Sequence, residues 1–217
     1  MDDQSCCRPM ETPERKLVYI PIIHTQADMG ALGPSLERMK VSKLGRLGST
    51  RQAGLVAKMW DEIERVVENL PVVAGKVRVY QDGLPVCGHE QQIVSQLAAA
   101  GSRNHRLLLR LQARGAVLMG TESPELLVQE YQLLTSALAS GLTGKAARAE
   151  ARQKPLRDVL LERRDRYIAG RINTTLAGGE TGILFLGMLH AANRYLDPGI
   201  RVVYPIRSPQ DRRGEGR

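Results

Sequence analysis

The 217-residue sequence predicts a single α/β domain, built on a mixed or mostly parallel β-sheet with helices on its faces. Two observations carry this prediction. Short apolar runs rich in β-branched residues alternate along the chain with longer segments of helical periodicity. The length and the 42% apolar content suffice for one substantial core. We expect the domain at residues 17–206, between a flexible segment at residues 1–16 and a disordered basic tail at residues 207–217.

The strands are expected where apolar runs are short and bounded by turn-forming residues. Residues 17–25 (LVYIPIIHT) form the first such run, and Pro21 within it marks a bulge or the strand end. Residues 76–86 alternate in polarity and contain the pair Asp82-Gly83, which predicts either a strand or a hairpin. The remaining strands are expected at residues 116–121, 182–190 and 200–206.

The helices are predicted from apolar residues that recur every three or four positions. Residues 54–70 show this spacing and stop before Pro71, and Trp60 is the expected core anchor of this helix. Ser123 is a good cap for a helix that begins at Pro124. Further helices are expected at residues 34–43, 90–100, 103–114 and about 145–176, with Gly45 loosening the chain after the first and Pro155 a candidate kink in the last.

Composition restricts the classes of partner. The net charge of +8 permits contact with phosphates or acidic surfaces, although a solvated basic face is the simpler interpretation. An aromatic content of only 4% and the lack of a recognised binding motif argue against a nucleic-acid function. The polar N-terminus does not resemble a signal peptide, and no apolar run approaches the ~20 residues that span a bilayer. We therefore expect a cytoplasmic protein without a membrane partner, whose three cysteines are free thiols.

Three of the predicted strands end near a side chain that can bind a metal. His24 and His190 end two of them, and Glu122 follows a third. Ligand sites gather at the carboxyl ends of parallel strands, and two imidazoles with one carboxylate can hold a divalent ion such as Zn²⁺ or Mn²⁺. Each residue alone has a simpler interpretation, because strand-end histidines are often packed or exposed and Glu122 could stabilise the start of the next helix.

Arg164 lies on the face of its predicted helix that should be buried. A buried guanidinium must find a partner, because an unpaired buried charge is very costly. Two interpretations are open: a structural salt bridge with Asp165 or Glu122, or a clamp for the oxyanion that develops beside a metal.

Other titratable groups are assigned from their positions. Asp28 lies shortly after the first strand, close to His24 in the sequence. His89 and His105 lie in or beside predicted surface helices, and we expect both to be exposed.

These elements carry short motifs that resemble the TraB/PrgY/Tiki-type family, within the wider group that includes ChaN haem-binding and erythromycin-esterase-like proteins. The run Gly187-Met-Leu-His190 matches the G-x-x-H motif of that family, and ERRDRYIAGRI at residues 162–172 is close to its E-R-N/D-x-x-M-A-x-x-I helix. The family's glutamate would be Glu122. The first motif departs from the pattern, since PIIH carries Pro21 where the family has glycine.

The resemblance implies metal-dependent hydrolysis, which in some relatives cleaves peptide bonds, whereas other relatives bind haem or act on esters. It implies that His24, Glu122 and His190 hold a divalent metal, with Asp28, or Glu122 if it is not a metal ligand, as the general base. It also implies that the substrate is a small molecule or a peptide, and haem is the less favoured cofactor. The alternative function is that of a non-catalytic ligand-binding or regulatory protein, which would use the same cleft and a basic surface.

Overall fold

The sheet of this protein is parallel throughout. A computed structural model describes residues 13–141 and 146–206, and its five strands lie in the order β3-β2-β4-β1-β5. The strands are β1 Arg15–Ile22, β2 Val77–Gln81, β3 Val117–Met119, β4 Thr181–Gly187 and β5 Ile200–Val203. The predicted α/β class is confirmed. The tail expected at residues 207–217 and most of the expected flexible lead-in lie outside the described residues.

The helices follow the predicted order along the chain. Their bounds are η1 Gln26–Leu32, α1 Gly33–Glu68, α2 Glu90–Ala99, α3 Arg103–Ala113, α4 Pro124–Gly141, α5 Ala146–Thr175 and η2 Ala192–Tyr195. Two separately predicted helices are the two parts of α1, which breaks at Gly45 with a φ of +71°. Glycine adopts this left-handed conformation at no steric cost, so the chain reverses there. Helix α5 continues through Pro155.

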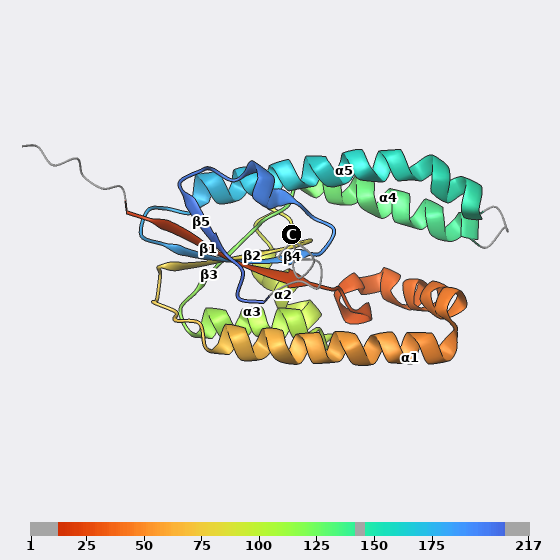
Figure 1. Ribbon diagram of the computed structural model, residues 1–217, viewed down its shortest axis with the longest axis horizontal. Helices are drawn as coiled ribbons and strands as arrows, with labels where there is room; N and C mark the ends of the chain where they lie inside the picture. The colour runs from red at the N-terminus through yellow and green to blue at the C-terminus, as the bar shows by residue number, and fades with distance from the viewer. Residues whose placement is uncertain (1–12, 142–145, 207–217) are drawn as a thin grey trace, which may run out of the picture.

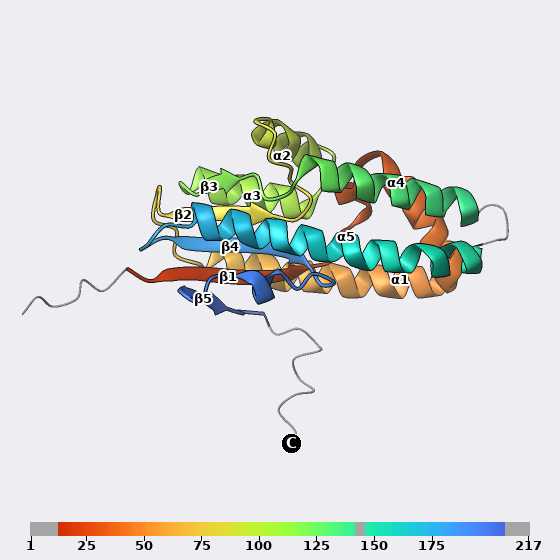
Figure 2. The same cartoon turned by 90° about the horizontal axis from the view of Figure 1, so that it is seen from above.

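Helices cover both faces of the sheet (Figures 1 and 2). On one face α1, α2 and α3 bury a core that contains Trp60 together with Val18, Ile20 and Phe185 of the sheet. On the other face α5 packs Ile168, Ile172 and Leu176 against alternate residues of the same strands. Each central strand is therefore apolar on both sides, which is typical of a parallel sheet between two helical layers. The expected role of Trp60 as a core anchor is confirmed, since it is 1% exposed.

Two predicted strand ends are wrong by a few residues, in ways that shape the site. Residues 76–86 form neither a long strand nor a hairpin, because β2 ends at Gln81 and the chain leaves the sheet at Asp82. The predicted strand at residues 182–190 ends at Gly187, so His190 lies in the turn that follows β4 rather than at its tip. The backbone N–H of Gly187 donates to the Asp82 carboxylate at 2.9 Å, so at this point a side chain replaces the next strand partner.

Pro21 sits in β1 without interrupting it. The carbonyl of Ile22 faces β4, where it accepts from the N–H of Met188. Because successive residues of a strand face opposite edges, Pro21 faces the β5 side, where pairing has already ended at Val18. The missing N–H of proline therefore costs no hydrogen bond of the ladder.

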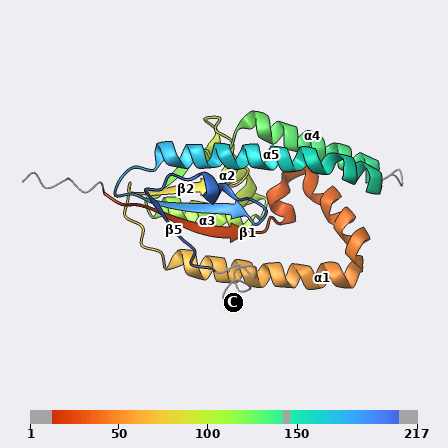
Figure 3. The ribbon, with the colours of Figure 1, turned by 45° about the horizontal axis from the view of Figure 1, so that its top comes forward.

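The helices also extend past the carboxyl edge of the sheet. The α4–α5 pair and helix α1 both project beyond the ends of the strands, and η1 lies between them (Figure 3). Side chains at the strand ends are therefore flanked by helices rather than left open to solvent. Within the described residues, no helix is both long enough and apolar enough to cross a membrane.

The packing between β1, β2 and β4 predicts the effect of adding one methyl group. In Gly182→Ala the new Cβ would lie 2.6 Å from Leu17 Cδ1 and 3.3 Å from Tyr80 Cε2. We expect this variant to lose about 1–3 kcal/mol of unfolding free energy in urea titrations, because well-packed cores resist extra volume. Gly170→Ala in α5 is the control, since its Cβ meets nothing within 4 Å. It should gain about 0.5–1 kcal/mol, and equal losses in both variants would contradict this packing.

Candidate active site

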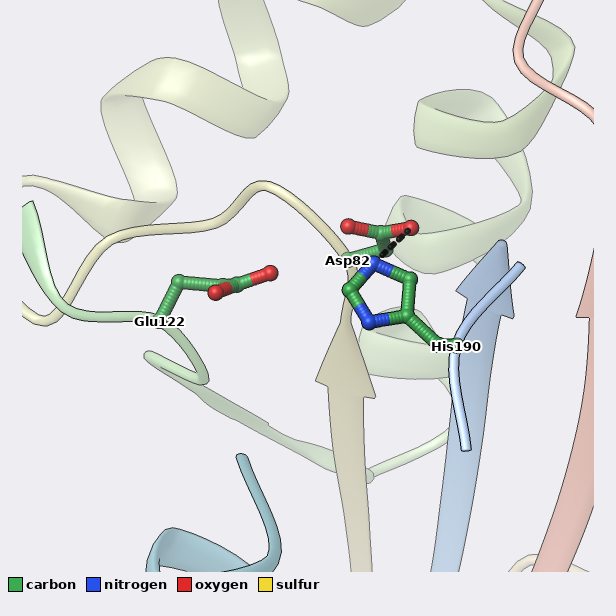
Figure 4. Close-up of side chains that lie close together, drawn as sticks. All are labelled: Asp82, Glu122 and His190. Carbon is green, nitrogen blue, oxygen red and sulfur yellow. Dashed lines mark ion pairs between the residues drawn. The ribbon is translucent and has the colours of Figure 1, made fainter. Parts of the chain in front are cut away.

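The carboxyl ends of four neighbouring strands bring polar side chains to one point. His24 follows β1, His190 follows β4, Asp82 follows β2 and Glu122 follows β3. Figure 4 shows Asp82, Glu122 and His190 facing one another across the ends of β2 and β4. The ligand atoms of these three residues all lie within 4.8 Å of one another. Of the three residues predicted as metal ligands, Glu122 and His190 belong to this group, whereas Asp82 stands in the place of His24, which contacts Asp82 instead.

Asp82 is the centre of this group. One of its oxygens, Oδ2, lies 3.0 Å from His24 Nε2 and 3.6 Å from His190 Nε2. The same oxygen accepts the hydrogen bond from the Gly187 backbone, while Oδ1 accepts from Arg164 at 2.9 Å. Both imidazoles therefore meet at one carboxylate. Burial alone would raise the pKa of Asp82, but the hydrogen bond from His24 and the nearby positive charges hold it well below its usual range.

Glycine is the only amino acid that fits at position 187. A Cβ there would lie 2.8 Å from Asp82 Oδ2 and 3.7 Å from His24 Nε2. Any side chain would push the carboxylate away from both histidines. The glycine of the G-x-x-H motif is therefore explained by the close approach of the β4 backbone to the site.

Asp165 orients His190. Its Oδ1 lies 2.6 Å from His190 Nδ1, and its Oδ2 accepts from the backbone N–H of Ala191 at 2.9 Å. Since an ionised carboxylate only accepts, Nδ1 carries the proton and Nε2 points toward Asp82 and Glu122. Burial would lower the pKa of His190, but the hydrogen bond to Asp165 and the charge of Asp82 outweigh burial and raise it.

Arg164 binds three carboxylates at once. It holds Glu122 in a bidentate pair, with Nη2 at 2.6 Å from Oε1 and Nε at 3.2 Å from Oε2. It also contacts Asp82, and its Nη1 lies 2.7 Å from Glu130 of α4. The expected burial of Arg164 is confirmed, at 4% exposed, and of the two expected salt-bridge partners only Glu122 is used. Asp165 faces His190 instead, and no nitrogen of the guanidinium is left without a carboxylate.

Carboxylates outnumber permanent cations in the site. Asp82, Glu122 and Glu130 contact the guanidinium of Arg164, and a fourth carboxylate, that of Asp165, contacts His190. Burial raises the pKa of Glu122, and the pair with Arg164 opposes that rise. Burial would lower the pKa of His24, but its hydrogen bond to Asp82 and the surrounding negative charge raise it. The excess negative charge thus favours a bound proton or a cation at the histidines.

Asp28 is placed beside the site but is already committed to other partners. It accepts from Thr25 N at 2.6 Å and from Thr25 Oγ1 at 2.7 Å, and a further short hydrogen bond comes from Ser102 Oγ. Burial would raise the pKa of Asp28, but these donors and His105 lower it to about 2. A carboxylate with so low a pKa is a weak base, so the geometry gives Asp28 the role of joining η1 to the start of α3.

His105 is buried, and the expectation that it is exposed is wrong. It is 5% exposed, with Nδ1 2.7 Å from Ser102 Oγ and 3.5 Å from Asp28 Oδ1. Ser102 caps α3 and also accepts from the backbone N–H of His105. The first turn of α3 therefore faces inward. His89, by contrast, is exposed as expected.

Three residues of the site are not among the candidates predicted from the sequence. Asp82 enters the prediction only in the Asp82-Gly83 pair of a strand or hairpin, although it follows a strand just as Glu122 does. Asp165 enters only as a partner of Arg164, and Glu130 does not enter. The sequence does hold a signal for Asp82, because each parallel strand can place a polar residue at the same edge of the sheet.

The carboxylates around Arg164 predict a large stability effect. Arg164→Met should lower the free energy of unfolding by about 3–5 kcal/mol, because it leaves buried carboxylates without a cation. The neighbouring Arg163→Met is the matched control, since Arg163 is exposed and bonds only Gln129 at 3.3 Å among the described residues. It should stay within about 0.5 kcal/mol of wild type. Chemical denaturation measures both, and similar values for the two variants would refute the role given to Arg164.

The chain was also compared with known proteins. Comparisons with protein-family models, with characterised proteins and with solved structures found no match.

Proposed function

We propose that this protein is a metal-dependent hydrolase of esters or amides, with its metal held by Asp82, Glu122 and His190. The observation that carries the proposal is the hydrogen bond from His190 Nδ1 to Asp165, which aims Nε2 at the point shared by the two carboxylates. Histidines that bind metals are commonly oriented by a carboxylate in this way. A histidine of merely structural role would not need its second nitrogen directed at two acidic groups.

The donor set fits a divalent cation. Carboxylate oxygens with one imidazole suit Mn²⁺ or Zn²⁺. Glu122 is paired with Arg164, but each carboxylate oxygen has two lone pairs, so the ion pair leaves acceptor capacity for a cation. Such a cation would also balance the excess of carboxylates. When bound, it would supply Lewis acidity and lower the pKa of a water molecule toward neutrality.

The remaining residues have distinct roles in this proposal. Arg164 positions the two carboxylates, because its nitrogens already bind Asp82 and Glu122. His24 is the most exposed of the four side chains that follow the strands, with 32% of its side chain exposed, and it lines the cavity in front of Asp82. It is therefore placed either to add a ligand or to exchange a proton with the substrate.

Membership of the TraB/PrgY/Tiki-type family is part of the same proposal. Its support is that the matching motifs converge: Gly187 and His190 meet Arg164 and Asp165 at the ends of the strands. The altered first motif still delivers His24, because Pro21 is accommodated in β1. The proposal does not need haem, and it places the substrate in the cavity lined by His24 and His190.

The first test is metal binding. Calorimetric titration of the metal-free protein with Mn²⁺ or Zn²⁺ should show one site per chain. Asp82→Asn and His190→Gln should each abolish it, because each removes a ligand. His89→Gln, at an exposed histidine away from the site, should bind as wild type. Metal-stimulated hydrolysis of an activated ester, absent in His190→Gln, would complete the test.

A different set of results would overturn the proposal. If wild type binds no metal and is retained on an anionic matrix in a salt-sensitive manner, the chain is better described as the non-catalytic binding protein. If Asp82→Asn and His190→Gln bind metal as wild type does, the ion sits elsewhere.

The second test concerns the orientation of His190. Asp165→Asn should weaken metal binding by about 10–100-fold while the fold persists, since Asp165 acts through the imidazole and not on the ion. Asp158→Asn in the same helix is the control, because Asp158 is 61% exposed and pairs only with Lys154 among the described residues. Titration calorimetry gives the affinities, and circular dichroism the fold. An unchanged affinity in Asp165→Asn would remove the observation on which the proposal rests.

A further inference from the structure

We propose that the substrate is an uncharged ester or amide whose apolar chain fills the cavity next to the site. This inference rests on the proposed hydrolase function and adds the class of compound that the site receives. The cavity measures about 490 Å³. That volume lies within the range of pockets that enclose most of a small organic ligand.

The walls of the cavity are apolar and come from five different elements. They include Ile22 of β1, Met29 of η1, Leu97 of α2, Leu127 and Leu134 of α4, and Leu161 of α5. A cavity assembled from so many separate elements is a feature of the fold rather than a gap beside one loop. An apolar chain that entered it would be removed from water along most of its length.

The polar groups lie together at one end. His24, Asp82, Arg164 and His190 line the cavity where the strands end. The apolar residues of α4 and η1 lie on elements that flank or project beyond that edge (Figure 3). A substrate carbonyl held at the polar end would therefore direct its chain between α4 and η1.

The charges of the lining disfavour an anionic chain. The charged and histidine side chains on the described lining each have a partner: Asp28 with Ser102, His105 with Ser102, Glu130 and Asp82 with Arg164, His190 with Asp165, and His24 with Asp82. None of these partners is a free cation that could bind a carboxylate or phosphate on the substrate chain, and the surplus of carboxylates at the polar end would repel an anion. An ammonium group on the chain would have to be buried among the apolar walls without a partner, which is costly. The lining and its walls together therefore favour a neutral chain.

Binding can be tested without catalysis. Nile red, a neutral apolar dye, should bind the metal-free full chain saturably, and octanol should displace it better than octanoate. Leu127→Trp should weaken dye binding by about tenfold or more, because the indole fills the cavity. Val128→Trp is the matched control, since Val128 is the next residue on α4, is 55% exposed and does not line the cavity. Leu134→Trp provides a second cavity-filling variant if the first does not fold.

Hydrolysis by the Mn²⁺-loaded protein gives the second readout. Among p-nitrophenyl acetate, butyrate and octanoate, kcat/KM should rise with chain length in wild type and in Val128→Trp. The rise should disappear in the cavity-filling variants. Dye binding without any hydrolysis would support the cavity assignment and contradict the proposed function. Hydrolysis that ignores chain length, dye binding that Leu127→Trp and Leu134→Trp leave unchanged, or stronger displacement by octanoate would overturn the inference.

Discussion

The ion pairs of Arg164 are the interaction on which the other features of the site depend. They join Glu122 after β3, Asp82 after β2 and Glu130 of α4 to one residue of α5. Three buried or half-buried carboxylates would repel one another without this cation. Burying charged groups costs free energy of desolvation, so these ion pairs are by themselves weak evidence for stability. Their main effect is on the position of α5. They fix the rotation of this helix about its axis, and that rotation turns Asp165 toward His190.

The topology of the sheet explains why the site lies where it does. Strand β4 follows β1, β2 and β3 in the chain but lies between β1 and β2 in the sheet, and β5 then extends the edge beside β1. Helix α1, which follows β1, covers one face. Helix α5, which leads into β4, covers the opposite face. Connections that diverge to opposite faces leave a crevice at the carboxyl ends of the strands. Gly187 lets the β4 backbone reach Asp82 in that crevice, and His190 follows in the next turn.

The fold class, the order of elements and the inward face of Arg164 were predictable, because apolar periodicity reports which side of each element is buried. His24, Glu122 and His190 were predictable as residues close to the ends of strands, although His190 lies three residues beyond the end of β4. Asp82 was not identified, since a local Asp-Gly pair also signals a turn and nothing nearby shows that a glycine over 100 residues later donates to its carboxylate. The burial of His105 depends on Asp28, which lies in another element. Local sequence patterns do not show which side chains of distant elements will be in contact.

The central claim is that one divalent cation belongs among Asp82, Glu122 and His190. A crystal of the full chain soaked with Mn²⁺, measured by anomalous diffraction, tests this most directly. We expect a single strong peak at ligand distance from His190 Nε2 and the two carboxylates, with the Asp165–His190 hydrogen bond retained. The absence of a peak at this site, or a peak coordinated by other residues, would contradict a metal site at these three residues. Arg164 alone would then balance the carboxylates.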